Sequence, residues 1–106
     1  MASFNNRRRV EEIIVDYGKL IEKEIDVKYI YLYGSCAKGT YTEDSDIDIA
    51  IVGDDFGRDI IEDTLLLMKL RRKIDYRLEP RPFRTIDFNP SNPLAREIMN
   101  TGIQVV

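Results

Sequence analysis

Two apolar runs on either side of a short polar stretch constrain the fold of this chain more than any other feature. Residues 27–33 (VKYIYLY) and 46–52 (DIDIAIV) are rich in β-branched and aromatic side chains, as strands are. Gly34 ends the first run, and residues 35–38 form a short turn or helix before a polar loop. The pattern therefore predicts two strands that are joined through a glycine corner.

The segments around these strands predict the remaining elements. Three helices are expected: residues 6–25, residues 58–72, and a last helix that begins at Asn92-Pro93 and stops at Gly102. Residues 73–79 alternate apolar and polar side chains, which predicts a third strand with one exposed face. The expected order is α-β-β-α-β-α, and the tail, residues 103–106, either adds to the sheet or covers the core.

The composition excludes several kinds of chemistry. With 106 residues the chain is expected to form one domain, residues 1–106. It has no histidine and one cysteine, so an internal disulfide, a histidine-containing zinc site, a Ser-His-Asp triad and a histidine general base are excluded. Any metal must then be a hard ion bound by carboxylate oxygens. No run approaches the roughly 18 apolar residues of a membrane span, and no signal peptide opens the chain, so we expect a cytoplasmic protein that does not bind membranes.

Charge is separated along the chain. Residues 43–63 contain nine acidic residues and one basic residue, whereas residues 69–84 contain seven basic and two acidic residues. Such segments suit a site where metal ions meet a polyphosphate, or a charged partner surface, although they also suit two ordinary solvated faces. Because the net charge is −3, direct binding to nucleic acid is not expected.

The candidate chemistry lies at the glycine corner and at the start of the second strand. Asp46 and Asp48 are two residues apart, so in a strand they point to the same face, where like charges repel unless a cation neutralises them. Magnesium takes one or two carboxylates together with substrate phosphates. Gly34 and Ser35 allow the backbone and a hydroxyl to approach phosphate. Each feature has an ordinary alternative, a solvated strand start or a simple turn, but their combination favours a functional site.

The arrangement Gly34-Ser35, ten residues, then Asp46-Ile47-Asp48 resembles the motif of the polymerase-β-type nucleotidyltransferases. The short length and the Gly-Ser-x-Ala-x-Gly opening resemble, within them, the minimal nucleotidyltransferase domain. The resemblance implies an α+β (two-layer α/β) fold, with a small mixed β-sheet flanked by helices. It also implies Mg²⁺-dependent transfer of a nucleoside monophosphate from a nucleoside triphosphate, with a third carboxylate on a neighbouring strand.

The third carboxylate is expected to be Asp75, which lies on the polar face of the predicted third strand. Glu79 is the alternative on the same face. Asp75 would otherwise form an ordinary surface ion pair with Arg77 or Lys73.

The resemblance implies the following site residues: Asp46, Asp48 and Asp75 for catalysis and for two Mg²⁺ ions, and Gly34, Ser35 and Lys38 for the phosphates of ATP. Cys36 and Lys38 stand where relatives commonly carry arginines. Lys38 still supplies a positive charge, but not a bidentate fork. Cys36 is interpreted as a small filler, because no histidine is present to activate it as a nucleophile.

The acceptor of the nucleotide is expected on another chain. About 30 residues follow Asp75, too few for a second domain. The resemblance implies a partner encoded nearby, a HEPN (higher eukaryotes and prokaryotes nucleotide-binding) toxin whose tyrosine receives AMP, so that this chain acts as a type VII-like antitoxin. Two alternatives stay open: a nucleotidyltransferase subunit that modifies a small molecule such as an antibiotic, and a non-catalytic antitoxin that acts by binding.

Overall fold

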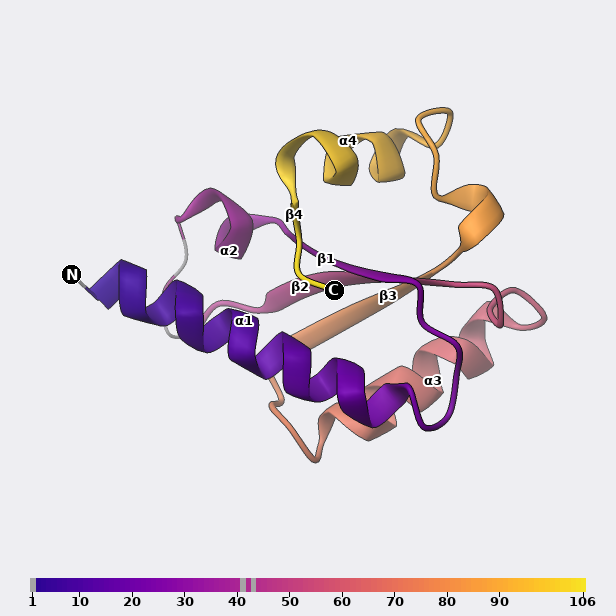
Figure 1. The fold of residues 1–106 in the computed structure, drawn as a ribbon, viewed down its shortest axis with the longest axis horizontal. Helices are drawn as coiled ribbons and strands as arrows, with labels where there is room; N and C mark the ends of the chain where they lie inside the picture. Colours follow the sequence, from indigo (N-terminus) through magenta and orange to yellow (C-terminus); the bar gives the residue numbers. More distant parts are fainter. Residues whose placement is uncertain (1, 41, 43) are drawn as a thin grey trace.

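A computed structural model describes residues 2–40, 42 and 44–106, with side chains from Arg8 onward (Figure 1). Its elements are α1 (Ala2–Ile21), β1 (Tyr29–Tyr33), α2 (Ser35–Lys38), β2 (Ile47–Gly53), α3 (Ile60–Arg71), β3 (Leu78–Arg84), a 3-10 helix (Thr85–Asp87), α4 (Pro93–Thr101) and β4 (Ile103–Gln104). The three predicted helices and the first two predicted strands are confirmed. Within the described part of the chain, no helix has both the length and the apolar character needed to cross a membrane.

The four strands form one mixed sheet in the order β3-β2-β1-β4. β2 runs antiparallel to β1 and parallel to β3, and β4 runs antiparallel to β1. Because β2 has a strand on each side and helices on both faces, all of its residues are buried except Asp48, which is half-buried. The predicted α+β class with a mixed sheet is confirmed.

Helices cover both faces of this sheet. Figure 1 shows α1 and α3 on one side of the strands and α4 on the other. The first face is packed by the buried stripe of α1, namely Val10, Ile13, Ile14, Tyr17 and Ile21, against the apolar residues of β1 and β2. On the second face Ala95 and Ile98 of α4 pack over Ala50 and Val52. The short helix α4 therefore adds a third layer to the two that were expected.

The predicted third strand was wrong in its position. Residues 72–77 form turns, and β3 begins only at Leu78 and continues to Arg84. This strand contains Pro80 and Pro82, which are typical of turns.

The two prolines are tolerated because β3 lies at the edge of the sheet. The Ile47 N–H donates to the Arg77 carbonyl at 2.7 Å, so the backbone groups of Arg77 face β2. By alternation Pro80 and Pro82 direct their nitrogens to the free edge, where a missing N–H costs no ladder hydrogen bond. Two prolines that are two residues apart are therefore compatible with this edge strand, although from the sequence alone they indicate a turn rather than a strand.

The tail does both things that were expected of it as alternatives: Ile103 and Gln104 add to the sheet, and Val105 and Val106 pack against the core. Gly102 ends α4, and a Cβ at this position would lie 2.6 Å from the Ile98 carbonyl oxygen and 2.8 Å from that of Leu32. Glycine therefore lets the chain pass close to β1, so that Ile103 and Gln104 can pair with it.

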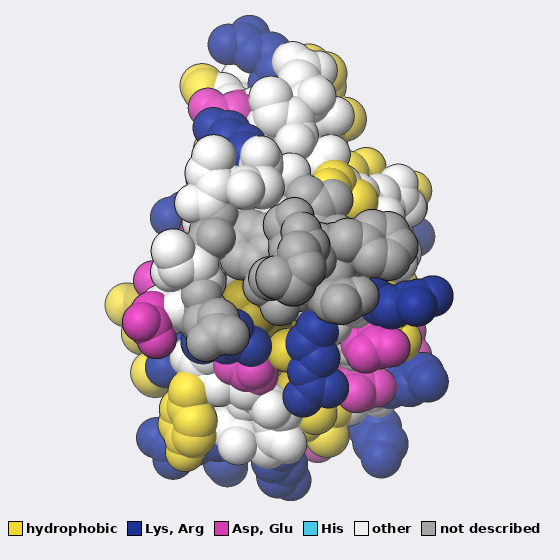
Figure 2. All heavy atoms as spheres, turned by 90° about the vertical axis from the view of Figure 1, so that its left-hand side faces the viewer, with side chains coloured by type: hydrophobic (Ala, Val, Ile, Leu, Met, Phe, Trp, Pro, Cys, Tyr) yellow, Lys and Arg dark blue, Asp and Glu magenta, His cyan; other side chains and the backbone are white. Residues whose placement is uncertain are grey.

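The two charged segments of the sequence come together in space. β2 belongs to the acidic segment, and its parallel neighbour β3 belongs to the basic segment. Within the basic segment Arg71 pairs with Glu79 and Arg77 pairs with Asp75. Figure 2 shows basic and acidic side chains intermixed on the face that lies at the left of Figure 1. The separation along the sequence therefore does not give a surface of one sign on this face.

Candidate active site

The glycine corner lies directly against a carboxylate of the second strand. Gly34 follows β1 with φ 74° and ψ −151°, a region that residues other than glycine almost never adopt. A Cβ built on Gly34 would lie 2.6 Å from Oδ2 of Asp48. The corner that precedes α2 is therefore in contact with the Asp-x-Asp segment.

The two aspartates of this segment differ in their surroundings. Asp46 is exposed and immediately precedes β2, whereas Asp48 is the second residue of the strand and is half-buried. Burial raises the pKa of Asp48, and the negative charges of Asp46 and Glu79 raise it further, while the charge of Arg81 lowers it. The predicted repulsion between the paired aspartates is thus present, and Glu79 adds to it.

Strand register explains why Glu79 belongs to this cluster. Asp48 is opposite Tyr33 of β1 on one side and opposite Glu79 of β3 on the other. The three side chains form a row on the α4 face of the sheet, since directly paired residues point the same way. A pocket of about 140 Å³ is lined by Tyr33, Asp48, Glu79, Pro80 and Arg81. A small ligand group can therefore reach Asp48 beside the part of the face that α4 covers.

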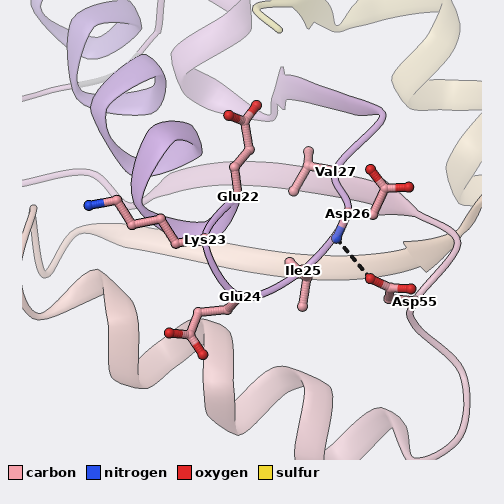
Figure 3. Close-up of a pocket in the computed structure, with 7 residues that line it drawn as sticks. All are labelled: Glu22, Lys23, Glu24, Ile25, Asp26, Val27 and Asp55. Carbon is pink, nitrogen blue, oxygen red and sulfur yellow. Dashed lines mark hydrogen bonds between the residues drawn. The ribbon is translucent and has the colours of Figure 1, made fainter.

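A larger hollow, of about 510 Å³, lies at the other end of β2 and is lined by residues 22–27 and Asp55 (Figure 3). There the Asp26 N–H donates to Oδ2 of Asp55 at 2.8 Å. Gly53, the last residue of β2, allows this connection to come close, since a Cβ on it would lie 2.4 Å from the Asp26 carbonyl oxygen. We interpret this hollow as the junction between the α1–β1 connection and the end of β2.

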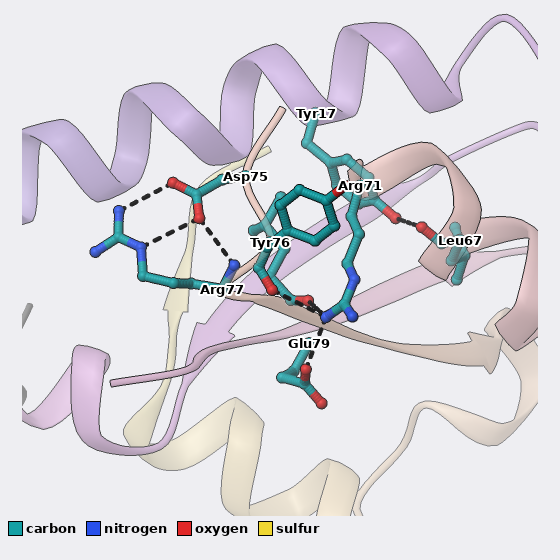
Figure 4. Close-up of polar contacts among 8 residues, drawn as sticks. Tyr17, Leu67, Arg71, Asp75, Tyr76, Arg77 and Glu79 are labelled. Atoms are coloured by element: carbon teal, nitrogen blue, oxygen red, sulfur yellow. Dashed lines mark hydrogen bonds and ion pairs between the residues drawn. The ribbon is translucent and has the colours of Figure 1, made fainter. Parts of the chain in front are cut away.

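Asp75, the residue expected as the third carboxylate, is engaged elsewhere. It lies in the turn before β3, where Oδ1 accepts the Arg77 backbone N–H at 2.8 Å and Oδ2 accepts Nη2 of Arg77 at 3.0 Å. These hydrogen bonds hold the pKa of Asp75 below its usual value, although burial opposes the shift. In Figure 4 Asp75 lies on the α1 side of the sheet, and Glu79 lies on the opposite side. The structure therefore brings Glu79, rather than Asp75, beside Asp48.

Arg71 was not singled out from the sequence, yet it contacts the new member of the cluster. It is the last residue of α3, and its Nη1 donates to Oε2 of Glu79 at 2.9 Å (Figure 4). The same nitrogen donates to the carbonyl oxygens of Tyr76 at 3.0 Å and Leu78 at 2.8 Å. The available signal was a basic residue at the end of the helix that crosses between two parallel strands.

The remaining predicted site residues lie in or beside α2. Ser35 opens this helix, and its carbonyl accepts the N–H of Gly39 and, at 3.1 Å, that of Thr40. Lys38 is exposed at the end of the helix. Cys36 is buried, as expected for a small filler, and its Sγ contacts the Asp46 carbonyl oxygen at 3.5 Å. Phosphate binding by Ser35 and Lys38 stays a prediction.

The oxygen ligands at this corner fit one kind of metal site. Among the described residues, no three His, Cys, Asp or Glu side chains are grouped so as to hold an ion by themselves. Asp46 and Asp48 nevertheless offer hard oxygen ligands where negative charge accumulates. Mg²⁺ is typically bound by one or two carboxylates, with substrate phosphates and water completing its shell. The donor set therefore fits Mg²⁺ that is held jointly with a nucleotide.

Comparison with known proteins gives consistent relatives. A family model described as "Polymerase beta, Nucleotidyltransferase" matches residues 16–106. The chain is 59% identical over 44 residues to MJ0604 and 35% identical over 65 residues to MJ1379, both candidate protein adenylyltransferases of Methanocaldococcus jannaschii. These matches cover 41% and 61% of this chain, and 44% and 65% of the relatives. The chain thus spans less than two thirds of the length of either relative.

Solved structures share the same architecture. A candidate nucleotidyltransferase from Sulfolobus solfataricus superposes with a TM-score of 0.69 and 15% identity, over 98% of this chain and 86% of that chain, which shows a common fold. A chain in a crystal structure of a toxin–antitoxin with AMP-PNP superposes with a TM-score of 0.62 and 26% identity, over 91% and 72% of the two chains. Since the family model also covers most of the chain, including the glycine corner and the Asp-x-Asp segment, this protein belongs to the polymerase beta nucleotidyltransferase family.

Proposed function

We propose that this protein transfers AMP from ATP, with Mg²⁺, to a tyrosine hydroxyl of a HEPN-type toxin and so acts as its antitoxin. The observation that carries the proposal is the contact between the Gly34 corner and Asp48, in a row that also holds Glu79. Adenylyl transfer is supported by the names of the two archaeal relatives. A toxin as partner is supported by the toxin–antitoxin structure with AMP-PNP.

On the nucleotide side, the corner supplies hydrogen-bond donors. The backbone N–H groups next to Gly34 and the hydroxyl of Ser35 would bind the phosphates of ATP, since a glycine lets a ligand approach the backbone closely. Lys38 would add a positive charge at the outer end of α2. Together these groups would orient the α-phosphorus toward Asp48 and Glu79, the two carboxylates of the row (the carboxylate row).

On the acceptor side, the carboxylates divide the work. Asp46 and Asp48 would hold Mg²⁺, and Glu79 would complete a second metal position with Asp48. When bound, the metal supplies charge neutralisation for the phosphates and the leaving group.

Glu79 would also receive the proton of the tyrosine hydroxyl, and it would thus take the catalytic place that the resemblance implied for Asp75. The hydroxyl oxygen forms a bond to the α-phosphorus, the bond from the α-phosphorus to the bridging oxygen breaks, and pyrophosphate leaves.

The test uses the purified chain, the product of the adjacent gene, Mg²⁺ and ATP labelled at the α-phosphate. We expect label on a tyrosine of the partner with the wild type, and none with Asp46→Asn or Asp48→Asn. Asp54→Asn is the matched control, because it removes an exposed acidic charge from the same segment, paired with Lys28 at 3.6 Å. ATP labelled at the γ-phosphate should leave the partner unlabelled.

Two outcomes would contradict the proposal. Labelling that persists in both aspartate variants would refute the assigned chemistry. An Asp46→Ala, Asp48→Ala, Glu79→Ala variant that transfers no AMP but still neutralises the partner in cells would show an antitoxin that acts by binding.

A further inference from the structure

We infer that Arg71 is a positioning residue for Glu79 and that it sets how tightly the carboxylate row binds Mg²⁺ together with a nucleotide. The inference rests on the proposed function. It concerns a residue that belongs to α3, on the opposite face of the sheet from the pocket, and that reaches the row around the edge of β3.

Arg71 is itself held firmly. One nitrogen, Nη1, shares its two hydrogens among the carbonyl oxygens of Leu78 at 2.8 Å and Tyr76 at 3.0 Å and the carboxylate of Glu79 at 2.9 Å. Its side chain is 19% exposed, so little of it is free to move into solvent. Two of the three acceptors are backbone groups, which gives the guanidinium a fixed place relative to β3.

Glu79 needs such a partner. Its side chain is 42% exposed and has three rotatable bonds, so packing by itself does not hold it in one conformation. The edge of β3 provides the route, because the Leu78 carbonyl faces away from β2 and draws Arg71 to that side. The ion pair then restrains the carboxylate of the residue that stands opposite Asp48.

The contact leaves the carboxylate usable. Arg71 engages Oε2 of Glu79, and Oε1 is not part of this bond. Partners that hydrogen-bond a metal-ligating carboxylate orient it, and their removal typically weakens metal binding or activity about 10- to 100-fold. Arg71 would orient the carboxylate of Glu79 in this way, and through Glu79 it would affect metal binding by the carboxylate row.

The decisive experiment compares Arg71→Met with Arg72→Met. Arg72 is the next residue, and its side chain is exposed, so its loss removes the same charge from the same helix end without touching Glu79. The readout is the Mg²⁺ concentration that half-saturates binding, measured by the rise in melting temperature and by calorimetry with α,β-methylene ATP. We expect this concentration to rise about 10- to 100-fold for Arg71→Met and to stay unchanged for Arg72→Met. Arg71→Lys should recover part of the loss.

A second comparison separates positioning from a purely structural role. In a Glu79→Gln background, Arg71→Met should change the Mg²⁺ requirement no further, because the group through which it acts is already lost. The inference would be overturned if Arg71→Met lowered the melting temperature but left the Mg²⁺ requirement unchanged, or if it lowered the Mg²⁺ requirement. It would also be overturned if Arg71→Met raised the Mg²⁺ requirement in the Glu79→Gln background as much as in the wild type. If one of these results is found but the wild type still binds Mg²⁺ with the analogue, only the inference about Arg71 fails and the proposed function is retained. A wild type that does not respond overturns both.

Discussion

Replacing Gly34 by alanine would disturb the contact on which the site depends. The new Cβ would lie 2.6 Å from Oδ2 of Asp48, whereas ordinary contacts of this kind begin at 3.4 Å. Because the corner backbone also has φ 74°, the carboxylate and the corner must move apart by most of an ångström. We therefore expect Gly34→Ala to displace Asp48 as well as to strain the backbone.

The matched control is Gly39→Ala at the other end of α2. Gly39 has φ 79°, and among the described residues no atom lies within 4 Å of the place that a new Cβ would occupy. This variant should cost about 1–2 kcal/mol of backbone strain, against about 1–3 kcal/mol for Gly34→Ala. With a melting entropy of about 0.22 kcal/mol/K for 106 residues, these values correspond to falls in melting temperature of about 5–9 °C and 5–14 °C.

The assay measures thermal unfolding and the rate of AMP transfer for both variants well below their melting temperatures. A displacement of about 1 Å in a catalytic group can cost about 100-fold in rate. The rate of AMP transfer should therefore fall about 100-fold in Gly34→Ala and stay within a few fold of the wild type in Gly39→Ala. Gly34→Ala with near wild-type transfer would refute the reasoning about the corner. Equal losses in the two variants would show that general destabilisation, rather than Asp48, is responsible.

Three further outcomes follow from the described contacts. Glu79→Gln should abolish AMP transfer, whereas Asp75→Asn should keep it, because Asp75 is bound to Arg77 on the other side of the sheet. Asp48→Asn should raise the melting temperature at pH 7 without Mg²⁺, and the gain should shrink as the pH falls. The pKa of Asp48 is raised in the folded state, so its negative charge destabilises the folded wild type at neutral pH. In acid the folded state takes up this proton before the unfolded state does, and the wild type loses the destabilising charge that Asn removes at every pH. Tyr17→Phe should cost about 1–2 kcal/mol in urea unfolding with transfer retained, since it removes a buried 2.6 Å hydrogen bond.

Each of these predictions has a result that contradicts it. Transfer by Glu79→Gln together with its loss in Asp75→Asn would restore the original assignment of the third carboxylate. A melting temperature of Asp48→Asn below that of the wild type at neutral pH would show that Asp48 is not strained by its charged neighbours. Loss of transfer in a folded Tyr17→Phe variant would indicate that the contact between α1 and α3 supports the site.

The parts of the site that were predictable are those that are local in sequence. Gly34 and Asp48 lie on a strand–corner–strand segment, so the pattern of residue types already specifies a turn, a short helix and a strand. The apolar stripe of α1 and the apolar run of β2 were likewise predictable. An amphipathic helix repeats its apolar residues every three to four positions, and a strand that is covered on both faces is apolar almost throughout.

Asp75 was predicted on the third strand beside Asp48, and its position was wrong for a physical reason. Residues 73–79 alternate as a strand does, but alternation over so few residues also occurs in a turn, where Tyr76 is exposed and Asp75 bonds Arg77. The true strand carries prolines that are acceptable only at a sheet edge. Neither edge position nor register can be derived from the strand itself.

The amino-acid pattern thus specified the glycine corner, the pair of aspartates and the helical stripes, since each depends on residues within one or two neighbouring elements. The partnership of Asp48 with Glu79, and of Glu79 with Arg71, depends on which strand lies beside β2 and in which register. The order and register of the strands are set by how α3 crosses the sheet and packs against it. This long-range outcome places Asp48 beside Glu79, about 30 residues further along the chain.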